Sequence, residues 1–254
     1  ASERHLTGDT EVSTVINPAG TATTHEEVGS LNTANTVSIT YNNGNGQING
    51  ALRILITLTL IALAPTIIIM MTSFTRIIIV LHFTRSALNT QTAPPNQILI
   101  GLALILTFFI MEPTITRINE EAIQPFEAGT IDQSEALEKG MAPLREFMYP
   151  QTQVKDVELF MEIAGLEWDG TLEDIPNSVL VPSFMISELR TAFWIGFTIY
   201  IPFIVIDMVV ASTLMSMGMM MLPPTTISMP FKILLFVLAD GWALIIGQLV
   251  QTFY

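Results

Sequence analysis

The chain has 254 residues, half of them hydrophobic, and a mean hydropathy of +0.53, so membrane association is the first hypothesis. A formal net charge of −13 argues against binding to nucleic acid, because the chain would repel phosphate backbones. The absence of cysteine excludes disulfides, iron–sulfur clusters and thiolate catalysis.

Residues 1–49 form a polar segment rich in Thr, Asn, Ser and Gly, a composition that packs poorly, and we expect this segment to be mostly disordered. The alternation over Val37–Tyr41 could pair as a strand, although nothing nearby supplies a second one. The chain begins with Ala1 and lacks a charged start followed by an apolar run. This favours a mature chain whose signal peptide was removed, although a shortened chain would look the same.

Residues 50–112 are expected to form a first apolar helical hairpin. Residues 51–71, ALRILITLTLIALAPTIIIMM, are long enough as a helix to cross a bilayer core of roughly 30 Å, and Pro65 predicts a kink. The second apolar stretch, residues 98–111, lies between Pro94-Pro95 and Pro113. Its length of about 21 Å is short for a membrane span and indicates packing against protein.

Residues 113–183 are strongly acidic, whereas Arg76, His82 and Arg85 lie between the first two apolar stretches. The positive-inside rule therefore places that first connection in the cytoplasm and the acidic region outside. Asp132 followed by Glu135 predicts a capped helix start, and the apolar residues from Val157 to Ala164 recur at helical spacing before Gly165. We expect an external helical region.

Residues 184–254 are expected to form a second apolar hairpin, from stretches at 191–217 and 231–250, with the methionine-rich segment MSMGMMMLPP at residues 215–224. Charged residues within apolar helices are costly and normally face a partner, a cavity or another subunit. Water at a helix end is an equally good environment for two of them, Glu188 and Arg190. The charged residues in question are Glu188, Arg190, Asp207, Lys232 and Asp240.

Two long blocks of this sequence resemble a known family. Residues 181–224, VPSFMISELRTAFWIGFTIYIPFIVIDMVVASTLMSMGMMMLPP, continue into MPFKILLFVLADGW at 229–242, and residues 70–113 form the second block. Both resemble the FliP family, core subunits of the flagellar type III protein-export gate, and the resemblance extends from residue 51 to the end. One departure is Trp194, where a polar or charged residue is expected.

The resemblance implies a function that no local motif supplies. FliP-like proteins assemble several copies, here expected to be five, with two smaller sister membrane proteins, FliQ-like and FliR-like, into a closed gate for unfolded export substrates. It implies a location in the bacterial inner membrane at the flagellar basal body, largely facing the periplasm, and a cleaved signal peptide. The related virulence secretion systems use a similar subunit, but the long N-terminal segment favours flagellar export.

The methionines allow two interpretations. Met215 and Met219 are spaced i,i+4, as are Met217 and Met221, so two helix faces carry methionine, and irregular core packing is the more frequent explanation. The resemblance instead implies a gasket that closes the pore, formed by three consecutive methionines. These correspond to Met219, Met220 and Met221, with Met215 and Met217 as further pore-loop residues.

The charged residues within the apolar stretches also allow more than one interpretation. The resemblance suggests an ion pair between neighbouring subunits, formed by Glu188 and Lys232, with Asp207, Asp240 and Arg190 as buried polar residues. Two membrane aspartates could also belong to an intramembrane protease, but VIDMVV and LADGW lack the expected surroundings. A proton-coupled transporter is the other alternative.

Enzymatic motifs are missing from the sequence. It contains no phosphate-binding G-x-x-x-x-G-K-[ST] loop and no G-x-S-x-G elbow, and its three histidines lack metal-ligand spacing. We therefore expect a non-enzymatic subunit with no cofactor and no metal. The expected fold is all-α, with membrane-associated helical hairpins that assemble into a ring-like or helical multi-subunit gate.

Overall fold

The structure is a computed structural model that describes residues 15–16, 22–23, 47–90, 92–168, 170–171, 175–219 and 221–254. The chain divides into two compact units, residues 1–57 and 58–254. In the first unit, strands β1 (Val15–Ile16) and β2 (Ala22–Thr23) pair antiparallel. The possible strand at Val37–Tyr41 and most of the segment expected to be disordered lie outside the described residues.

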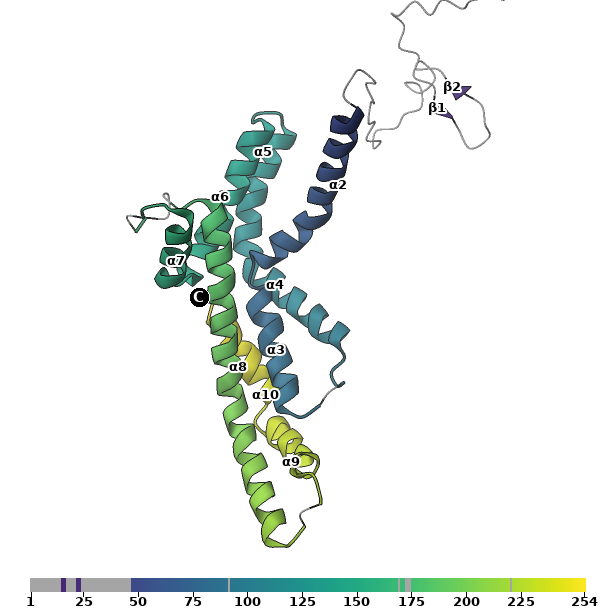
Figure 1. The fold of residues 1–254 in the computed structure, drawn as a ribbon, viewed down its shortest axis with the longest axis vertical. Helices are drawn as coiled ribbons and strands as arrows, with labels where there is room; N and C mark the ends of the chain where they lie inside the picture. Colours follow the sequence, from purple (N-terminus) through teal and green to yellow (C-terminus); the bar gives the residue numbers. More distant parts are fainter. Residues whose placement is uncertain are drawn as a thin grey trace, which may run out of the picture. The chain divides into compact units, whose positions relative to one another are not determined.

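Helices make up the described part of the second unit, so the all-α prediction is confirmed (Figure 1). Helix α2 begins in the first unit and ends in the second. The helices are α2 (Gln47–Met70), α3 (Phe74–Ala87), α4 (Asn96–Ile118), the π-helical turn η1 (Asn119–Ile123), α5 (Gln124–Glu127), α6 (Gln133–Gln151), α7 (Val154–Ala164), α8 (Asn177–Ser216), α9 (Pro224–Leu238) and α10 (Gly241–Gln251).

The chain bends sharply directly after the first apolar stretch. Pro65 lies inside α2, and a bend of 66° between α2 and α3 follows Met70. Met71 is buried in the core at this bend, so packing fixes the direction of the chain here. The basic segment that follows is helix α3 and not a loop, and Arg76 within it is buried.

The helix formed by the second apolar stretch is longer than expected from the prolines on either side of that stretch. Pro95 immediately precedes α4, but Pro113 lies inside it, and the helical path continues through η1 and α5. The result is a helix of 32 residues, Asn96–Glu127, long enough to cross a membrane. The expectation of a short span was therefore wrong, because a helix packed against its neighbours can continue past one missing N–H group.

The acidic region contains the helices that its spacing predicted. The Asp132 side chain accepts a hydrogen bond from the backbone N–H of Glu135 at 2.8 Å and caps α6. The Glu135 carboxylate pairs with Lys139 at 2.9 Å, so it takes part in an exposed pair along the helix. Helix α7 ends at Gly165 in the left-handed conformation, as expected of a C-terminal glycine.

Helix α8 carries most of the packing in the second unit. It is 40 residues long, α3 lies along it, and α7 and α9 also contact it (Figure 1). At Gly196 a Cβ atom would lie 2.5 Å from the Phe83 ring, so the glycine permits the close approach of α3. The main buried cluster between these helices contains Ile77, Val80 and Leu81 of α3, Leu99, Ala103 and Ile110 of α4, Ala192 of α8 and Leu249 of α10.

The fourth apolar stretch is two helices and not one. Helices α9 and α10 meet at a bend of 65°, where Asp240 has a left-handed backbone with φ of 48°. A Cβ atom at Gly241 would lie 2.4 Å from the Phe236 ring. The bend therefore depends on a residue without a side chain packing against that ring.

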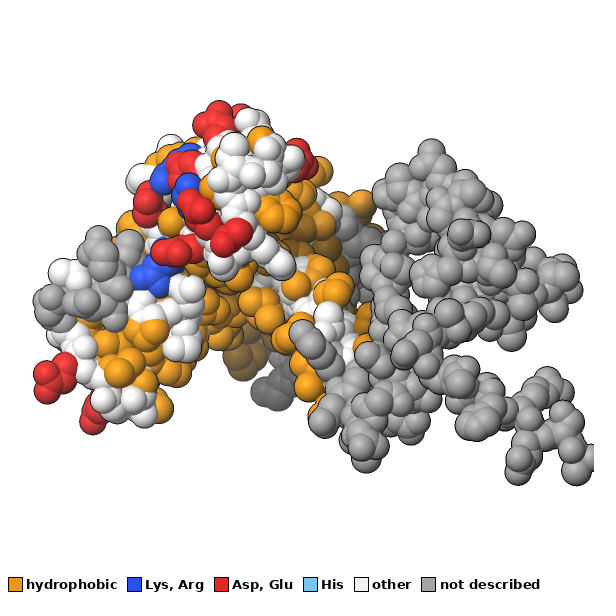
Figure 2. Space-filling view, turned by 90° about the horizontal axis from the view of Figure 1, so that it is seen from above, with side chains coloured by type: hydrophobic (Ala, Val, Ile, Leu, Met, Phe, Trp, Pro, Cys, Tyr) orange, Lys and Arg blue, Asp and Glu red, His pale blue; other side chains and the backbone are white. Residues whose placement is uncertain are grey.

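Hydrophobic side chains cover much of the outer surface. In the described part of the chain, Asn96–Glu127 and Asn177–Ser216 are each long and apolar enough to cross a membrane, and the two bent pairs would raise the number of spans to four. Figure 2 shows acidic and basic side chains gathered on one part of the molecule, beside extensive hydrophobic surface. The exposed hydrophobic residues include Leu60, Ile61, Ile105, Phe108, Phe193, Trp194, Met208 and Leu238.

Candidate functional site

The methionine-rich segment connects α8 to α9, and a hydrogen-bonded turn at Gly218 ends α8. Gly218 has a positive φ of 75°, and its N–H donates to the Met215 carbonyl at 3.1 Å. The next N–H, of Met219, donates to the Leu214 carbonyl at 3.0 Å. This pair of bonds is a Schellman motif, which ends a helix on a left-handed glycine. Gly218 therefore closes α8 in a defined way and does not merely loosen it.

The two prolines begin the next helix. Pro223 is the residue before α9, and Pro224 is its first residue. A proline suits this position because the first N–H groups of a helix have no partner within it, and its fixed φ is already helical. We call residues 217–223 the methionine turn.

The methionines of this segment are exposed in the described chain. The exposed fractions are 61% for Met215, 68% for Met217, 42% for Met219 and 98% for Met221. Met220 lies outside the described residues. Irregular packing in the core of the chain therefore does not explain these four side chains.

A polar contact between Asp207 of α8 and two residues of α9, Ser228 and Lys232, joins the helices on either side of the methionine turn. Lys232 Nζ lies 2.6 Å from Asp207 Oδ2, and the Ser228 hydroxyl donates to the other carboxylate oxygen of Asp207. Ser228 and Lys232 are buried, and the Asp207 side chain is 28% exposed. Ser228 and Lys232 are four residues apart, so both lie on the face of α9 that meets α8. We call Asp207, Ser228 and Lys232 the clasp.

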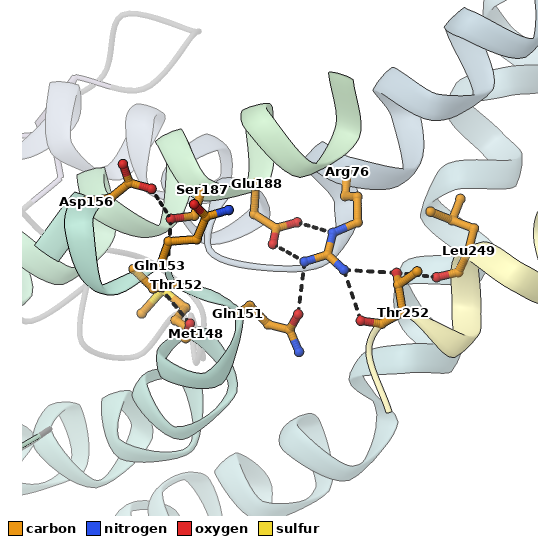
Figure 3. A network of polar contacts seen from close by, with 10 residues as sticks. All are labelled: Arg76, Met148, Gln151, Thr152, Gln153, Asp156, Ser187, Glu188, Leu249 and Thr252. Atoms are coloured by element: carbon orange, nitrogen blue, oxygen red, sulfur yellow. Dashed lines mark hydrogen bonds and ion pairs between the residues drawn. The ribbon is translucent and has the colours of Figure 1, made fainter. Parts of the chain in front are cut away.

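A second polar site is centred on Arg76, at the start of α3 (Figure 3). Its Nε donates to Glu188 Oε2 at 2.9 Å, and a terminal nitrogen contacts the other carboxylate oxygen. The remaining donors reach Gln151 at the end of α6 and Thr252 after α10. The guanidinium also lies 4.0 Å from the centre of the Phe253 ring. One arginine thus connects four segments.

A third polar site joins Asp156 of α7 to two residues of α8, Ser187 and Arg190. Arg190 donates to both of its carboxylate oxygens, at 2.7 and 2.8 Å, and the Ser187 hydroxyl donates at 2.6 Å (Figure 3 includes Ser187). Burial raises the pKa of the Asp156 carboxyl, but the hydrogen bonds from Arg190 and Ser187 outweigh it, and the net pKa lies below the ordinary value. The contact attaches the acidic region to α8.

The structure places the charged residues singled out in the sequence in different environments. Within the chain Glu188 pairs with Arg76, and Lys232 pairs with Asp207. The pair between Glu188 and Lys232 concerns neighbouring subunits and stays a prediction. In the single chain Arg190 and Asp240 are exposed and Asp207 is partly buried. Burial of these three residues in an assembly of subunits stays a prediction.

Sequence reasoning did not single out Arg76, Asp156 or Ser228 as site residues. Arg76 entered only as a marker of orientation, although an arginine in an apolar segment already suggests a carboxylate partner. Asp156 is one acid among many, and Ser228 has no distinguishing context, so no sequence signal identifies either of them. Their roles come from contacts between helices that are distant in sequence.

The described residues contain no group of three or more potential metal ligands. His82 lies beside Arg85, with 3.0 Å between their nitrogens, and His5 and His25 lie outside the described residues. The clasp, the Arg76 site and the Asp156 site can each hold helices together. In each of these sites the charged groups form an ion pair with one another.

These features define the class: a helical membrane-associated protein with an exposed methionine turn and buried ion pairs between its helices. The profile of the FliP family matches residues 57–249, and the chain belongs to that family. It is 56% identical to the flagellar biosynthetic protein FliP of Bacillus subtilis (strain 168) over 207 residues, 82% of this chain and 94% of the relative.

Other relatives carry the same name. The flagellar biosynthetic protein FliP of Pectobacterium carotovorum subsp. carotovorum is 52% identical over 212 residues, 84% of this chain and 82% of the relative. The protein of that name from Aquifex aeolicus (strain VF5) is 48% identical over 212 residues, 83% of this chain and 89% of the relative. Family membership favours the export-gate interpretation over the transporter and the protease.

Proposed function

We propose that this chain is a pore subunit of the flagellar type III export gate, which passes unfolded flagellar proteins across the bacterial inner membrane. The observation that carries the proposal is the exposed methionine turn at the end of two apolar helices, in a chain of the FliP family. Flexible thioether side chains from several copies would meet and close a hole without a fixed geometry. They would yield to an arriving polypeptide.

In this proposal the seal consists of Met219, Met220 and Met221, with Met215 and Met217 beside it. Met221 is 98% exposed, so a single chain leaves it without packing. Contact with the same turn of neighbouring copies would cover this side chain. Five copies, together with FliQ-like and FliR-like sister proteins, complete the proposed gate, which lies at the flagellar basal body and largely faces the periplasm.

The proposed role is not catalytic. Asp207 is engaged by Lys232 and Ser228, whereas Asp240 is exposed at the bend between α9 and α10. An aspartyl protease needs two carboxylates that share one proton, and these two have separate environments.

The first test is the native mass of the detergent-extracted chain, produced alone and together with the two sister proteins. A discrete homo-oligomer that adds the sister proteins would support the proposal. Export is then measured in cells that lack the chain, with secreted flagellar protein as the readout and the wild-type chain as the control. A stable monomer that ignores the sister proteins, or normal export without the chain, would contradict it.

A further inference from the structure

A polar cavity of about 550 Å³ lies between the end of α3 and the start of α9. The residues that line it are Arg85, Ser86, Asn89 and Thr90 on one side and Thr225, Thr226 and Met229 on the other. The Asn89 side-chain amide donates to the Thr225 carbonyl at 3.3 Å and joins the two sides. Small-ligand sites have volumes of about 300–1,000 Å³, so the cavity is large enough for a ligand.

Arg85 is the charged residue among those that line the cavity, and neutral groups hold its guanidinium in place. One terminal nitrogen donates to the Pro94 carbonyl at 3.3 Å and to the Asn96 side chain, and the other lies 3.0 Å from His82 Nδ1. Among the described residues, no carboxylate pairs with Arg85, and its Nε makes no hydrogen bond. The guanidinium is therefore fixed in direction while its charge is not neutralised.

The sequence explains why the surrounding helices do not neutralise this arginine. It contains no Asp or Glu between Glu27 and Glu112, and none between Asp207 and Asp240. Helix α3, the start of α4 and helix α9 all lie within these two stretches. An anion that compensates the charge of Arg85 therefore has to come from outside these helices.

The cavity lies where three apolar helices begin or end. Helix α3 ends at Ala87, α4 begins at Asn96 and α9 begins at Pro224, and each belongs to a helix or bent helix pair that is long and apolar enough to cross a membrane. The ends of spanning helices lie at the level of the lipid headgroups. Next to the cavity, Ile98 of α4 and Phe231 of α9 are 60% and 56% exposed, so apolar surface adjoins the polar site.

We propose that this cavity binds the phosphate of an anionic phospholipid at the membrane surface. The planar guanidinium of Arg85 matches the geometry of phosphate oxygens, and the hydroxyls of Ser86, Thr225 and Thr226 supply neutral donors. Basic pockets between apolar helices bind the headgroups of such lipids. The acyl chains lie along the apolar surface of α4 and α9. The site goes beyond the proposed gate, because a lipid bound here holds α3 against α9 whatever passes through the pore.

Thermal unfolding of the full chain in lipid nanodiscs tests the proposal. The discs contain either phosphatidylcholine alone or an equal mixture of phosphatidylcholine and phosphatidylglycerol. We expect the wild type to unfold at a higher temperature in the mixture, because a ligand of the folded state stabilises it. Arg85→Gln should lose this increase. Lys155→Gln removes an exposed cation of α7 with the same change in net charge, and this control should keep it.

Affinity is measured on the detergent-extracted chain by native mass spectrometry during titration with phosphatidylglycerol. We expect Arg85→Gln to weaken binding about tenfold or more, because hydrogen bonds to a charged group are lost. The same titration with phosphatidylcholine provides the reference for unspecific lipid binding. Equal affinity of wild type and Arg85→Gln for phosphatidylglycerol would contradict the proposal.

A second variant leaves Arg85 and its contacts in place. Thr225→Val combined with Thr226→Val removes two hydroxyls from the opposite side of the cavity at nearly constant volume. We expect this double variant to unfold close to the wild type in phosphatidylcholine and to lose part of the increase in the mixture. If Arg85 only holds the chain together, its substitution lowers the unfolding temperature equally in both compositions, and the double variant keeps the full increase.

The source of the phosphate is tested by adding inorganic phosphate to the wild type in phosphatidylcholine discs. Stabilisation by phosphate alone would indicate a site for a free anion and overturn the lipid assignment. A lower native mass of Arg85→Gln in phosphatidylcholine would indicate that Arg85 pairs with a carboxylate of a second copy, and it would also overturn the proposal. Both results are independent of the export measurement, so they are distinguishable from failure of the proposed function.

Discussion

Arg76 and Glu188 stand 112 residues apart in the sequence and form an ion pair that is almost entirely removed from solvent. The side chain of Arg76 is 3% exposed and that of Glu188 is fully buried. Because α3, α8, α6 and the residues after α10 all meet at this arginine, the pair links most of the helical unit. Variants that lack this pair therefore test how much it contributes to the stability of the fold.

Replacing one partner of this pair should destabilise the chain strongly. Glu188→Leu leaves the Arg76 guanidinium buried without a carboxylate, a situation that typically costs about 3–5 kcal/mol. Adding Arg76→Met to that variant removes the stranded charge and should recover much of the stability. Thermal unfolding of the detergent-extracted protein measures both. If the double variant is no more stable than Glu188→Leu alone, the buried charge is not the cause.

Charge reversal separates the two possible partners of Lys232. Lys232→Glu places a second carboxylate beside that of Asp207, so we expect assembly to fail. Asp207→Lys should restore it if the pair within the chain dominates, whereas Glu188→Lys should restore it if Lys232 also pairs with a neighbouring subunit. The native mass of the complex is the readout. Rescue by neither change would contradict both pairings.

The methionine seal predicts an ion leak. Replacing Met219, Met220 and Met221 together by alanine removes the flexible side chains that close the hole, so small ions should pass while assembly is kept. Uptake of an otherwise impermeant ion by cells producing the variant measures this. Met208→Ala, on an exposed part of α8 before the turn, is the control. An ion-tight triple variant would exclude the gasket.

Gly196→Ala tests the close packing of α3 on α8. The added methyl group would lie 2.5 Å from the Phe83 ring, and overpacking of this kind costs about 1–3 kcal/mol. Gly101→Ala is the matched control, because no atom lies within 4 Å of its added Cβ, and alanine favours a helix by about 1 kcal/mol over glycine. Thermal unfolding should order the proteins as Gly101→Ala, wild type, Gly196→Ala, from most to least stable.

The Asp156 site predicts a loss of stability in acid. The folded pKa of this carboxyl is lowered, so its contribution is present above the ordinary aspartate pKa of 3.8 and disappears as the pH falls through the lower folded value. Asp156→Asn cannot titrate and should lose that part of the pH dependence. Limited proteolysis of α7 between pH 6 and about pH 2 measures it. Identical acid profiles for the two proteins would contradict the assignment.

The sequence by itself determined the class of this protein. The apolar stretches, the capped start of α6 and the glycine after α7 depend on composition and local spacing, so they can be recognised along the chain. The methionine-rich segment can be recognised in the same way, because Gly218 and the pair Pro223-Pro224 indicate the end of a helix. The FliP family followed from long blocks of residues, which the comparison confirmed.

Only the tertiary structure decided which charges meet and where the helices bend. Pro113 is a helix breaker by local rules, yet it lies inside α4, because packing against neighbouring helices outweighs one lost hydrogen bond. The partners of Glu188 and Lys232 come from distant segments, and sequence spacing does not encode such contacts. Long-range packing sets them, since a charge buried among apolar helices must meet whichever opposite charge the fold brings within reach.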